Sequence, residues 1–103
     1  MANSIPTLAD LELYPYLMDG ELPSEFAGKV GIYAIFDQTQ TLQYVGYSRD
    51  VRVGLTQHLV RCPQQCHWFK VHTVERPSRT LLDGIKSSWL EEYGSVPPGN
   101  SEQ

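Results

Sequence analysis

Four side chains that can bind a metal ion stand close together in the middle of the chain. His58 and Cys62 are four residues apart, the spacing of one helix face, and Cys66 and His67 follow after a short loop. This spacing matches no established zinc pattern, and two cysteines are too few for a secreted disulfide framework. We therefore expect ordinary reduced thiols and a histidine near a helix end, with a zinc site as the alternative.

Basic side chains that could contact phosphate stand at two places. Arg76 and Arg79 flank the start of a predicted helix, where backbone N–H groups favour anions. Lys70 lies between Trp68 and His72 on one face of a predicted strand, an arrangement that can stack bases and contact phosphate. We therefore take Lys70, Arg76 and Arg79 as the candidate nucleic-acid-binding residues. The alternatives are solvated surface arginines and a tryptophan that covers a helix.

Hydrophobic patterning predicts the strands that position these residues. The run Val30 to Phe36 is rich in β-branched and aromatic residues, residues 37–41 are polar, and residues 42–48 alternate apolar with polar side chains. This pattern is typical of a β-hairpin. A third strand is predicted over His67 to Val74, with Phe69 and Val71 on one face.

Two amphipathic helices are predicted between and after these strands. The first has Ser48 or Asp50 as its cap and ends before Pro63. The second begins after Ser78 and ends at Gly94. Each helix carries one apolar stripe: Val51, Leu55 and Leu59 in the first, and Leu81, Leu82, Ile85, Trp89 and Leu90 in the second.

The resulting fold class is α+β, a single small domain with a central three-stranded antiparallel sheet flanked by helices in the order β-β-α-β-α. Residues 1–28 contain several prolines and glycines but also leucines and tyrosines, so we expect an irregular acidic arm packed on the body. Residues 29–103 form the body and end in an irregular tail.

Length and charge limit the classes of function. The length of 103 residues leaves room for one domain. The net charge of the chain is −4. Residues 1–25 hold five acidic residues and no basic one, residues 26–88 hold all eight basic residues against four acidic ones, and residues 89–103 add three acidic residues. The body is thus only mildly basic. No apolar run is long enough to span a membrane and no signal peptide is evident, so we expect a cytoplasmic protein that does not bind membranes.

Two tripeptides, whose tyrosines are eleven positions apart, resemble the motifs of a known family. Gly31-Ile32-Tyr33 and Tyr44-Val45-Gly46 resemble the paired motifs of the GIY-YIG nuclease superfamily. The whole chain also resembles small stand-alone members of that family from cyanobacteria. The resemblance covers roughly residues 30–100 and continues through Ser48, Asp50, Leu55, His58, Pro97 and Asn100.

The resemblance implies hydrolysis of a DNA phosphodiester with a divalent metal, usually Mg²⁺. Tyr33 and Tyr44 would position or activate water, and His58 would assist proton transfer. Asp83 is the acidic residue of the last helix that could hold the metal. No small-molecule cofactor is expected.

Two positions depart from the family pattern. Gly54 stands where the family has an arginine, and Lys86 or Ser88 stands where it has a metal-binding glutamate. A glycine inside a helix indicates either close packing or drift after the arginine was lost, and drift is the simpler interpretation. We therefore expect impaired catalysis. The alternative is a non-catalytic module that binds nucleic acid or a protein, as a subunit of a larger assembly.

Overall fold

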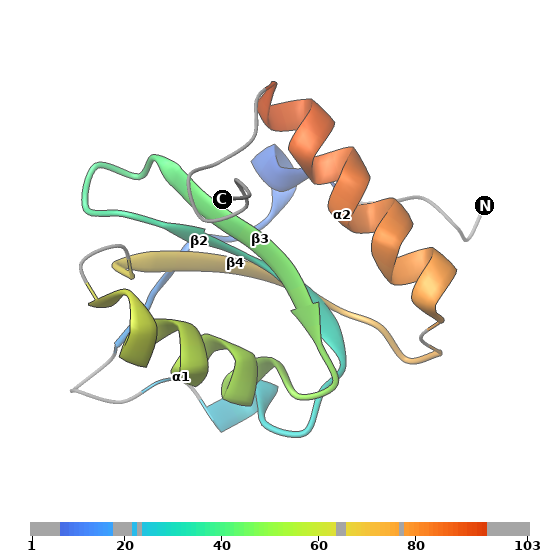
Figure 1. Ribbon diagram of the computed structural model, residues 1–103, viewed down its shortest axis with the longest axis horizontal. Coiled ribbons are helices and arrows are strands. Elements are labelled where there is room, and N and C mark those ends of the chain that lie inside the picture. The colour runs from blue at the N-terminus through green and yellow to red at the C-terminus, as the bar shows by residue number, and fades with distance from the viewer. Residues whose placement is uncertain (1–6, 18–21, 23, 64–65, 77, 95–103) are drawn as a thin grey trace.

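The computed structural model describes residues 7–17, 22, 24–63, 66–76 and 78–94 (Figure 1). The predicted tail and, within the arm, residues 1–6, 18–21 and 23 lie outside the described residues. The elements, in chain order, are two short 3₁₀ helices and a short strand, then a hairpin, a helix, a strand and a helix: η1 (Leu8–Asp10), β1 (Tyr14–Pro15), η2 (Ser24–Phe26), β2 (Gly31–Phe36), β3 (Leu42–Ser48), α1 (Val51–Arg61), β4 (Trp68–Thr73) and α2 (Arg79–Tyr93).

The strands form one antiparallel sheet in the order β1-β4-β2-β3, so the predicted α+β class is confirmed. The sheet has four strands instead of the predicted three. The additional strand, β1, comes from the predicted arm, and in it Tyr14 pairs with Phe69 and Pro15 with Trp68. Two residues are too short a strand for an alternating pattern to reveal.

Each face of the sheet is covered by one helix (Figure 1). Alternation along β2 directs Tyr33 and Ile35 toward α1, and Ile32 and Ala34 toward α2. The α1 side also contains Phe69 and three residues of the arm, Tyr16, Leu22 and Phe26. The α2 side is centred on Trp89, which is fully buried.

The register of the hairpin shifts at its turn end. Ile35 pairs with Tyr44, whereas Phe36 pairs with Leu42, so Gln43 is an extra residue in β3. Its side-chain amide donates to the Asp37 carboxylate at 2.9 Å. Strict alternation along β3 would place Leu42 and Tyr44 on one face, but the shift places Leu42 on the α2 side and Tyr44 on the α1 side.

Both helices have the caps that their sequences predict. Of the two candidates for α1, Asp50 is the N-cap, because its carboxylate accepts from the Val53 N–H at 3.2 Å. Ser78 caps α2 by accepting from the Leu81 N–H at 3.1 Å, and Gly94 ends α2 in the left-handed conformation. In the described part of the chain, no helix has the length and apolar character needed to cross a membrane.

Two contacts join the arm to the body on the α2 side. The Glu92 carboxylate accepts from the backbone N–H groups of Leu8 and Ala9, at 2.7 and 3.0 Å. The Lys70 ammonium donates to the Leu8 carbonyl at 2.6 Å. These contacts hold η1, a described part of the predicted arm, against the end of α2 and the middle of β4.

Candidate functional site

The structure brings together three of the residues predicted to act in catalysis. The ring centroids of Tyr33 and Tyr44 are 6.0 Å apart, and the Tyr44 ring stacks on the His58 imidazole at 4.7 Å. Tyr33 and Tyr44 come from the two strands of the hairpin and His58 from α1. Gly46 makes room for this aromatic cluster, because a Cβ there would lie 2.6 Å from the Tyr44 ring.

Burial shifts the pKa values of two members of the aromatic cluster, Tyr33 and His58, in the direction that favours their neutral forms. Burial raises the pKa of Tyr33, and the neighbouring Tyr44 adds to the effect while Arg61 opposes it. Burial also lowers the pKa of His58, with a further contribution from the charge of Arg61. The Nε2 atom of His58 is buried and has no hydrogen-bond partner. The roles of Tyr33 and Tyr44 in positioning or activating water, and of His58 in proton transfer, stay predictions.

Helix α1 approaches Tyr33 closely at Gly54, so there is little room for a side chain at this position. A Cβ on Gly54 would lie 2.9 Å from the Tyr33 hydroxyl oxygen and 3.1 Å from the Cβ of Ser48. These separations are shorter than van der Waals contact. Close packing therefore explains this glycine, and drift, the simpler interpretation of the sequence, is not needed.

Substitution of Gly54 by alanine is expected to destabilise the protein by about 1 kcal/mol, because the overpacking cost exceeds the gain in helix propensity. In a Tyr33→Phe background the hydroxyl is absent, and the same substitution should cost less. Urea denaturation of the four proteins of this double-mutant cycle measures the difference. An identical cost in both backgrounds would contradict the proposed contact with the hydroxyl.

Asp83, the predicted metal ligand, lies on the opposite side of the sheet from the aromatic cluster. Its carboxylate accepts from the Tyr47 hydroxyl at 2.8 Å and lies 3.9 Å from Nε of Arg79. In the described ranges, no group of three His, Cys, Asp or Glu side chains is arranged to hold a metal ion. The zinc alternative at His58, Cys62, Cys66 and His67 therefore has no support among these residues, while Mg²⁺ binding at Asp83 stays a prediction.

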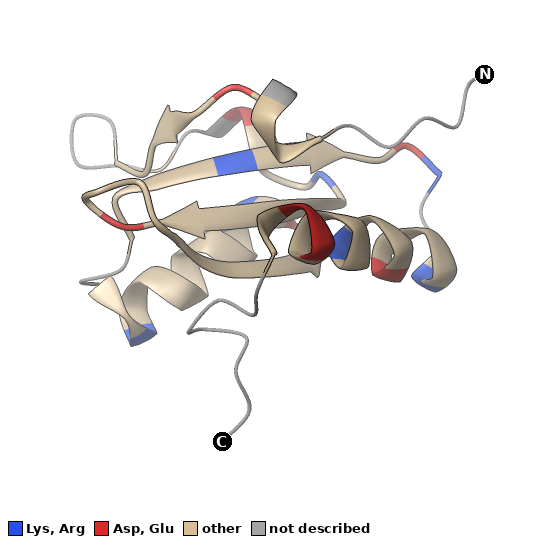
Figure 2. Cartoon of the chain, turned by 90° about the horizontal axis from the view of Figure 1, so that it is seen from above, with Lys and Arg blue, Asp and Glu red and all other residues tan. Residues whose placement is uncertain are grey.

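The three predicted nucleic-acid-binding residues do not form one surface. Lys70 is half-buried and its ammonium donates to the Leu8 carbonyl. Arg79 is the first residue of α2, and Arg76 lies in the exposed turn before this helix. In Figure 2 the blue positions of Lys and Arg are likewise spread over separate helices, strands and loops. A phosphate backbone is usually bound by a continuous basic surface, which this arrangement does not offer.

The two cysteines lie at the end of α1. Cys62 is the C-cap residue, where the backbone leaves the helical conformation before Pro63, and it is half-buried. Cys66 is buried against the α1 side of the sheet, and its Sγ atom lies 3.3 Å from the Cys62 carbonyl oxygen. Both are free thiols. The turn that follows α1 therefore places one accessible thiol beside one buried thiol.

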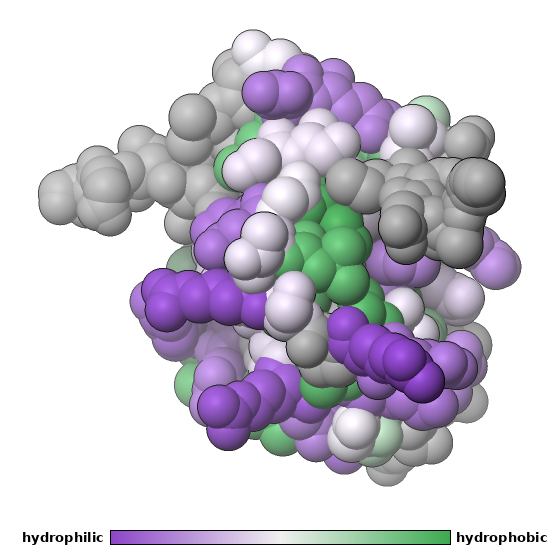
Figure 3. Space-filling view, turned by 90° about the vertical axis from the view of Figure 1, so that its right-hand side faces the viewer, coloured by the Kyte–Doolittle hydropathy of each residue, from purple (hydrophilic) through white to green (hydrophobic). Residues whose placement is uncertain are grey.

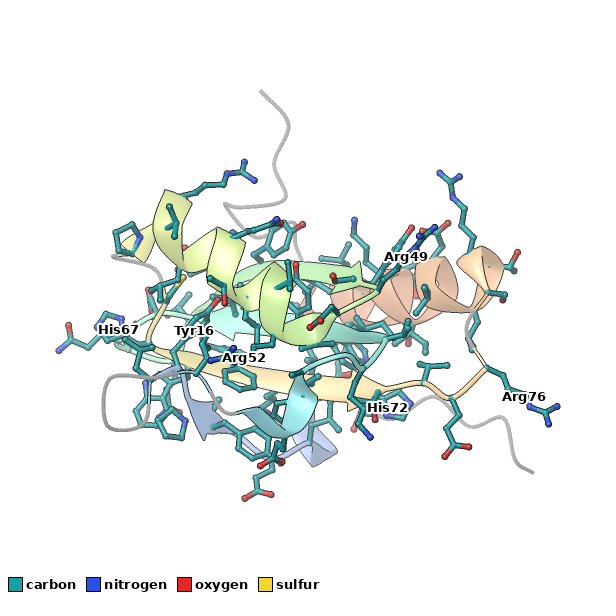
Figure 4. All side chains as sticks on the ribbon, turned by 90° about the horizontal axis from the view of Figure 1, so that it is seen from below. Tyr16, Arg49, Arg52, His67, His72 and Arg76 are labelled. Carbon is teal, nitrogen blue, oxygen red and sulfur yellow. The ribbon has the colours of Figure 1, made fainter. Side chains whose placement is uncertain are left out.

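Burial of Cys66 sets its acidity. Desolvation raises the pKa of this thiol to about 11; the nearby Tyr16 hydroxyl opposes the shift and the neighbouring Cys62 adds to it. Tyr16 is fully buried and reaches from the arm to α1, where its hydroxyl donates to the Leu55 carbonyl at 2.5 Å (Figure 4). Sequence reasoning treated these thiols as ordinary. The four-residue spacing between them was the available signal, but it could not show which thiol is buried.

Comparison with known proteins contradicts the predicted family. No protein-family model matches the chain. The chain is 35% identical over 104 residues to "Bifunctional monothiol glutaredoxin-S16, chloroplastic" of Arabidopsis thaliana, and the alignment covers 97% of this chain. It covers 34% of that protein, so the chain spans about a third of the length of the curated relative.

This finding contradicts the predicted function. The similar protein is named as a glutaredoxin, a class that catalyses thiol–disulfide exchange, and not as a nuclease. On this comparison the assignment to the GIY-YIG superfamily is wrong, together with the predicted endonuclease and hydrolase activity. The alternative of a non-catalytic module is not supported either, nor is nucleic-acid binding, whereas a protein partner is compatible with the similarity. The chain is thus similar, over nearly its whole length, to part of a bifunctional monothiol glutaredoxin.

Proposed function

We propose that this chain takes part in thiol–disulfide exchange through Cys62 and Cys66. The observation that carries the proposal is the pairing of an accessible thiol with a buried one, with Sγ of Cys66 3.3 Å from the Cys62 carbonyl oxygen. The name of the similar protein, a monothiol glutaredoxin, supports thiol–disulfide chemistry in general, while the use of two cysteines rests on the structure of this chain alone. The partner would be a protein or glutathione that carries a disulfide, and the compartment a reducing one such as the cytoplasm.

The exchange has two steps. In the first, the Cys62 thiolate attacks a disulfide R–S–S–R′, so that a Cys62–S–S–R bond forms and R′–S⁻ leaves. In the second, the Cys66 thiolate attacks Sγ of Cys62, a Cys62–Cys66 disulfide forms and R–S⁻ leaves. The chain loses two protons and two electrons, and the partner disulfide gains them as two thiols. Cys62 is proposed to react first because it is the more exposed of the two: Cys62 is half-buried, whereas Cys66 is buried.

The test is oxidation of the purified chain at pH 9 by glutathione disulfide, followed by acid quenching and mass spectrometry. The wild type should form an intramolecular disulfide, seen as the loss of two hydrogens. Cys66→Ser should stop at a mixed disulfide between Cys62 and glutathione. Cys62→Ser should stay largely reduced, because Cys66 is 6% exposed. If the mixed disulfide accumulated in the wild type and no Cys62–Cys66 disulfide formed, the second step would be contradicted and the exchange would use Cys62 alone. Thiols that stay reduced in every variant would contradict the proposal.

The second step should depend steeply on pH. Burial raises the pKa of Cys66 to about 11. As long as the pH is below this value, each increase of one pH unit raises the thiolate fraction of Cys66 about tenfold. The mixed disulfide is therefore expected to accumulate at pH 7 and to close about a hundredfold faster at pH 9. Quenched-flow sampling of the glutathione adduct measures this rate. A rate that does not change between pH 7 and pH 9 would show that Cys66 is already ionised.

A further inference from the structure

A cleft lies at the end of the molecule where β3 finishes and α2 begins. It has a volume of about 640 Å³, within the range of small-molecule sites. The residue before β2, the last residues of β3 and the first turn of α2 line it; they include Val30, Tyr47, Arg49, Arg79 and Leu82. Figure 3 faces this end and shows an apolar strip bordered by hydrophilic side chains.

The apolar wall of the cleft is part of the core on the α2 side. Leu82 is buried there, and Val30 and Tyr47 pack against the same cluster while remaining partly accessible. The Tyr47 hydroxyl donates to Asp83, which holds its ring in place. A ligand would therefore meet a fixed wall made of one aromatic and two aliphatic side chains.

Two arginines supply the charge at the cleft. Arg79 belongs to the first turn of α2, where the positive end of the helix dipole lies, and its contact with Asp83 is long and exposed to solvent. Arg49 forms no ion pair with any residue in the described ranges. Figure 4 shows Arg49 on the side of α2, whereas Arg76 points away from the fold.

The other polar side chains of the cleft are already engaged. Ser78 accepts from the Leu81 N–H, and the Ser48 hydroxyl donates to the Asp50 carbonyl at 2.9 Å and accepts from the Asp50 N–H at 3.1 Å. The guanidinium groups of Arg49 and Arg79 are therefore the charged donors available to a ligand. Guanidinium forks match the oxygens of phosphate and carboxylate groups.

We propose that this cleft binds a small organic anion, whose apolar or aromatic body lies on Val30, Tyr47 and Leu82 and whose phosphate or carboxylate group lies between Arg49 and Arg79. The site lies outside the proposed thiol chemistry, because no cysteine lines it. Its occupant must combine both features, since three side chains give an apolar molecule only a small contact area and exposed arginines alone bind anions weakly in water.

The probe for this site is 1-naphthyl phosphate, with 1-naphthol and inorganic phosphate as the matched half-probes. Titration of the full chain, followed by amide chemical shifts in NMR spectra, should show saturable changes at residues 47–49 and 78–82. The Kd for 1-naphthyl phosphate should be at least about tenfold lower than for either half-probe. Aliphatic and aryl carboxylates, titrated in parallel, distinguish the two anionic groups.

Two charge variants and one control separate this site from general electrostatic attraction. Arg49→Gln and Arg79→Gln should each weaken binding about tenfold, the usual loss for a charge-assisted hydrogen bond. Arg76→Gln removes the same charge from an exposed residue outside the cleft and should leave the Kd unchanged. An equal loss in Arg76→Gln, equal binding of 1-naphthol, or no saturable shift at these residues would overturn the proposal.

Discussion

Replacement of Gly31 by alanine is expected to destabilise the protein by about 3 kcal/mol, the upper end of the usual cost of overpacking. A Cβ at this position would lie 2.5 Å from the carbonyl oxygen of His72 and 3.0 Å from the Cα atom of Thr73. Both neighbours are backbone atoms of β4, so no side-chain rotation can relieve the clash. The two inner strands would have to separate at the end where β2 begins and β4 finishes. Urea denaturation measures the loss.

Gly84 provides the matched control for this substitution. It is exposed in the middle of α2, and a Cβ there would meet no atom within 4 Å. Gly84→Ala should therefore stabilise the protein by about 0.5 to 1 kcal/mol through helix propensity alone. If Gly31→Ala left the unfolding midpoint unchanged or raised it as Gly84→Ala should, the close approach of the two strands at Gly31 would be wrong.

Phe69→Ala is expected to cost about 3 to 5 kcal/mol and to release the arm from the body. Phe69 is fully buried in β4, and its ring contacts three aromatic rings of the arm, with centroids 5.4 Å from Tyr14, 5.6 Å from Tyr16 and 5.8 Å from Phe26. No other described ring joins as many of the arm's aromatic residues. Without it, the amide of Tyr16, which donates to the His67 carbonyl at 2.9 Å, should exchange its hydrogen much faster.

Ile85→Ala tests whether the release of the arm is specific. Ile85 is 2% exposed in the core on the α2 side, so its truncation should also destabilise the fold, by about 2 to 5 kcal/mol. It does not contact the aromatic residues on the α1 side. The amide exchange rate of Tyr16 is compared between the two variants after correction for their loss of global stability. An equal increase in both would show that the arm unfolds only with the whole domain.

Local patterns were sufficient to predict most of the body. Residues 31–36 and 42–48 form the predicted hairpin because β-branched and aromatic residues flank a polar turn. Ser78 and Gly94 delimit the second helix as expected, because capping depends on neighbouring residues alone. The placement of Tyr44 and Tyr47 on opposite faces also follows from alternation within one strand.

Features that depend on distant residues were not predictable in this way. The strand β1 exists only because Tyr14 meets Phe69, 55 positions later in the sequence. The role of Gly54 requires the position of Tyr33, and the burial of Cys66 requires the arm residue Tyr16. For the candidate site, sequence reasoning placed Asp83 with the tyrosines, whereas the fold places it on the other side of the sheet.

The short strand β1 also has a consequence for self-association. An unpaired edge at β4 would offer backbone groups to a second molecule, and such edges promote aggregation. Tyr14 and Pro15 cover the edge beside Phe69 and Trp68, and Pro15 has no N–H to offer on its outer side. The opposite edge strand, β3, is interrupted by the extra residue Gln43, another feature that discourages pairing between molecules. Release of the arm would therefore lower the solubility of the protein as well as its stability.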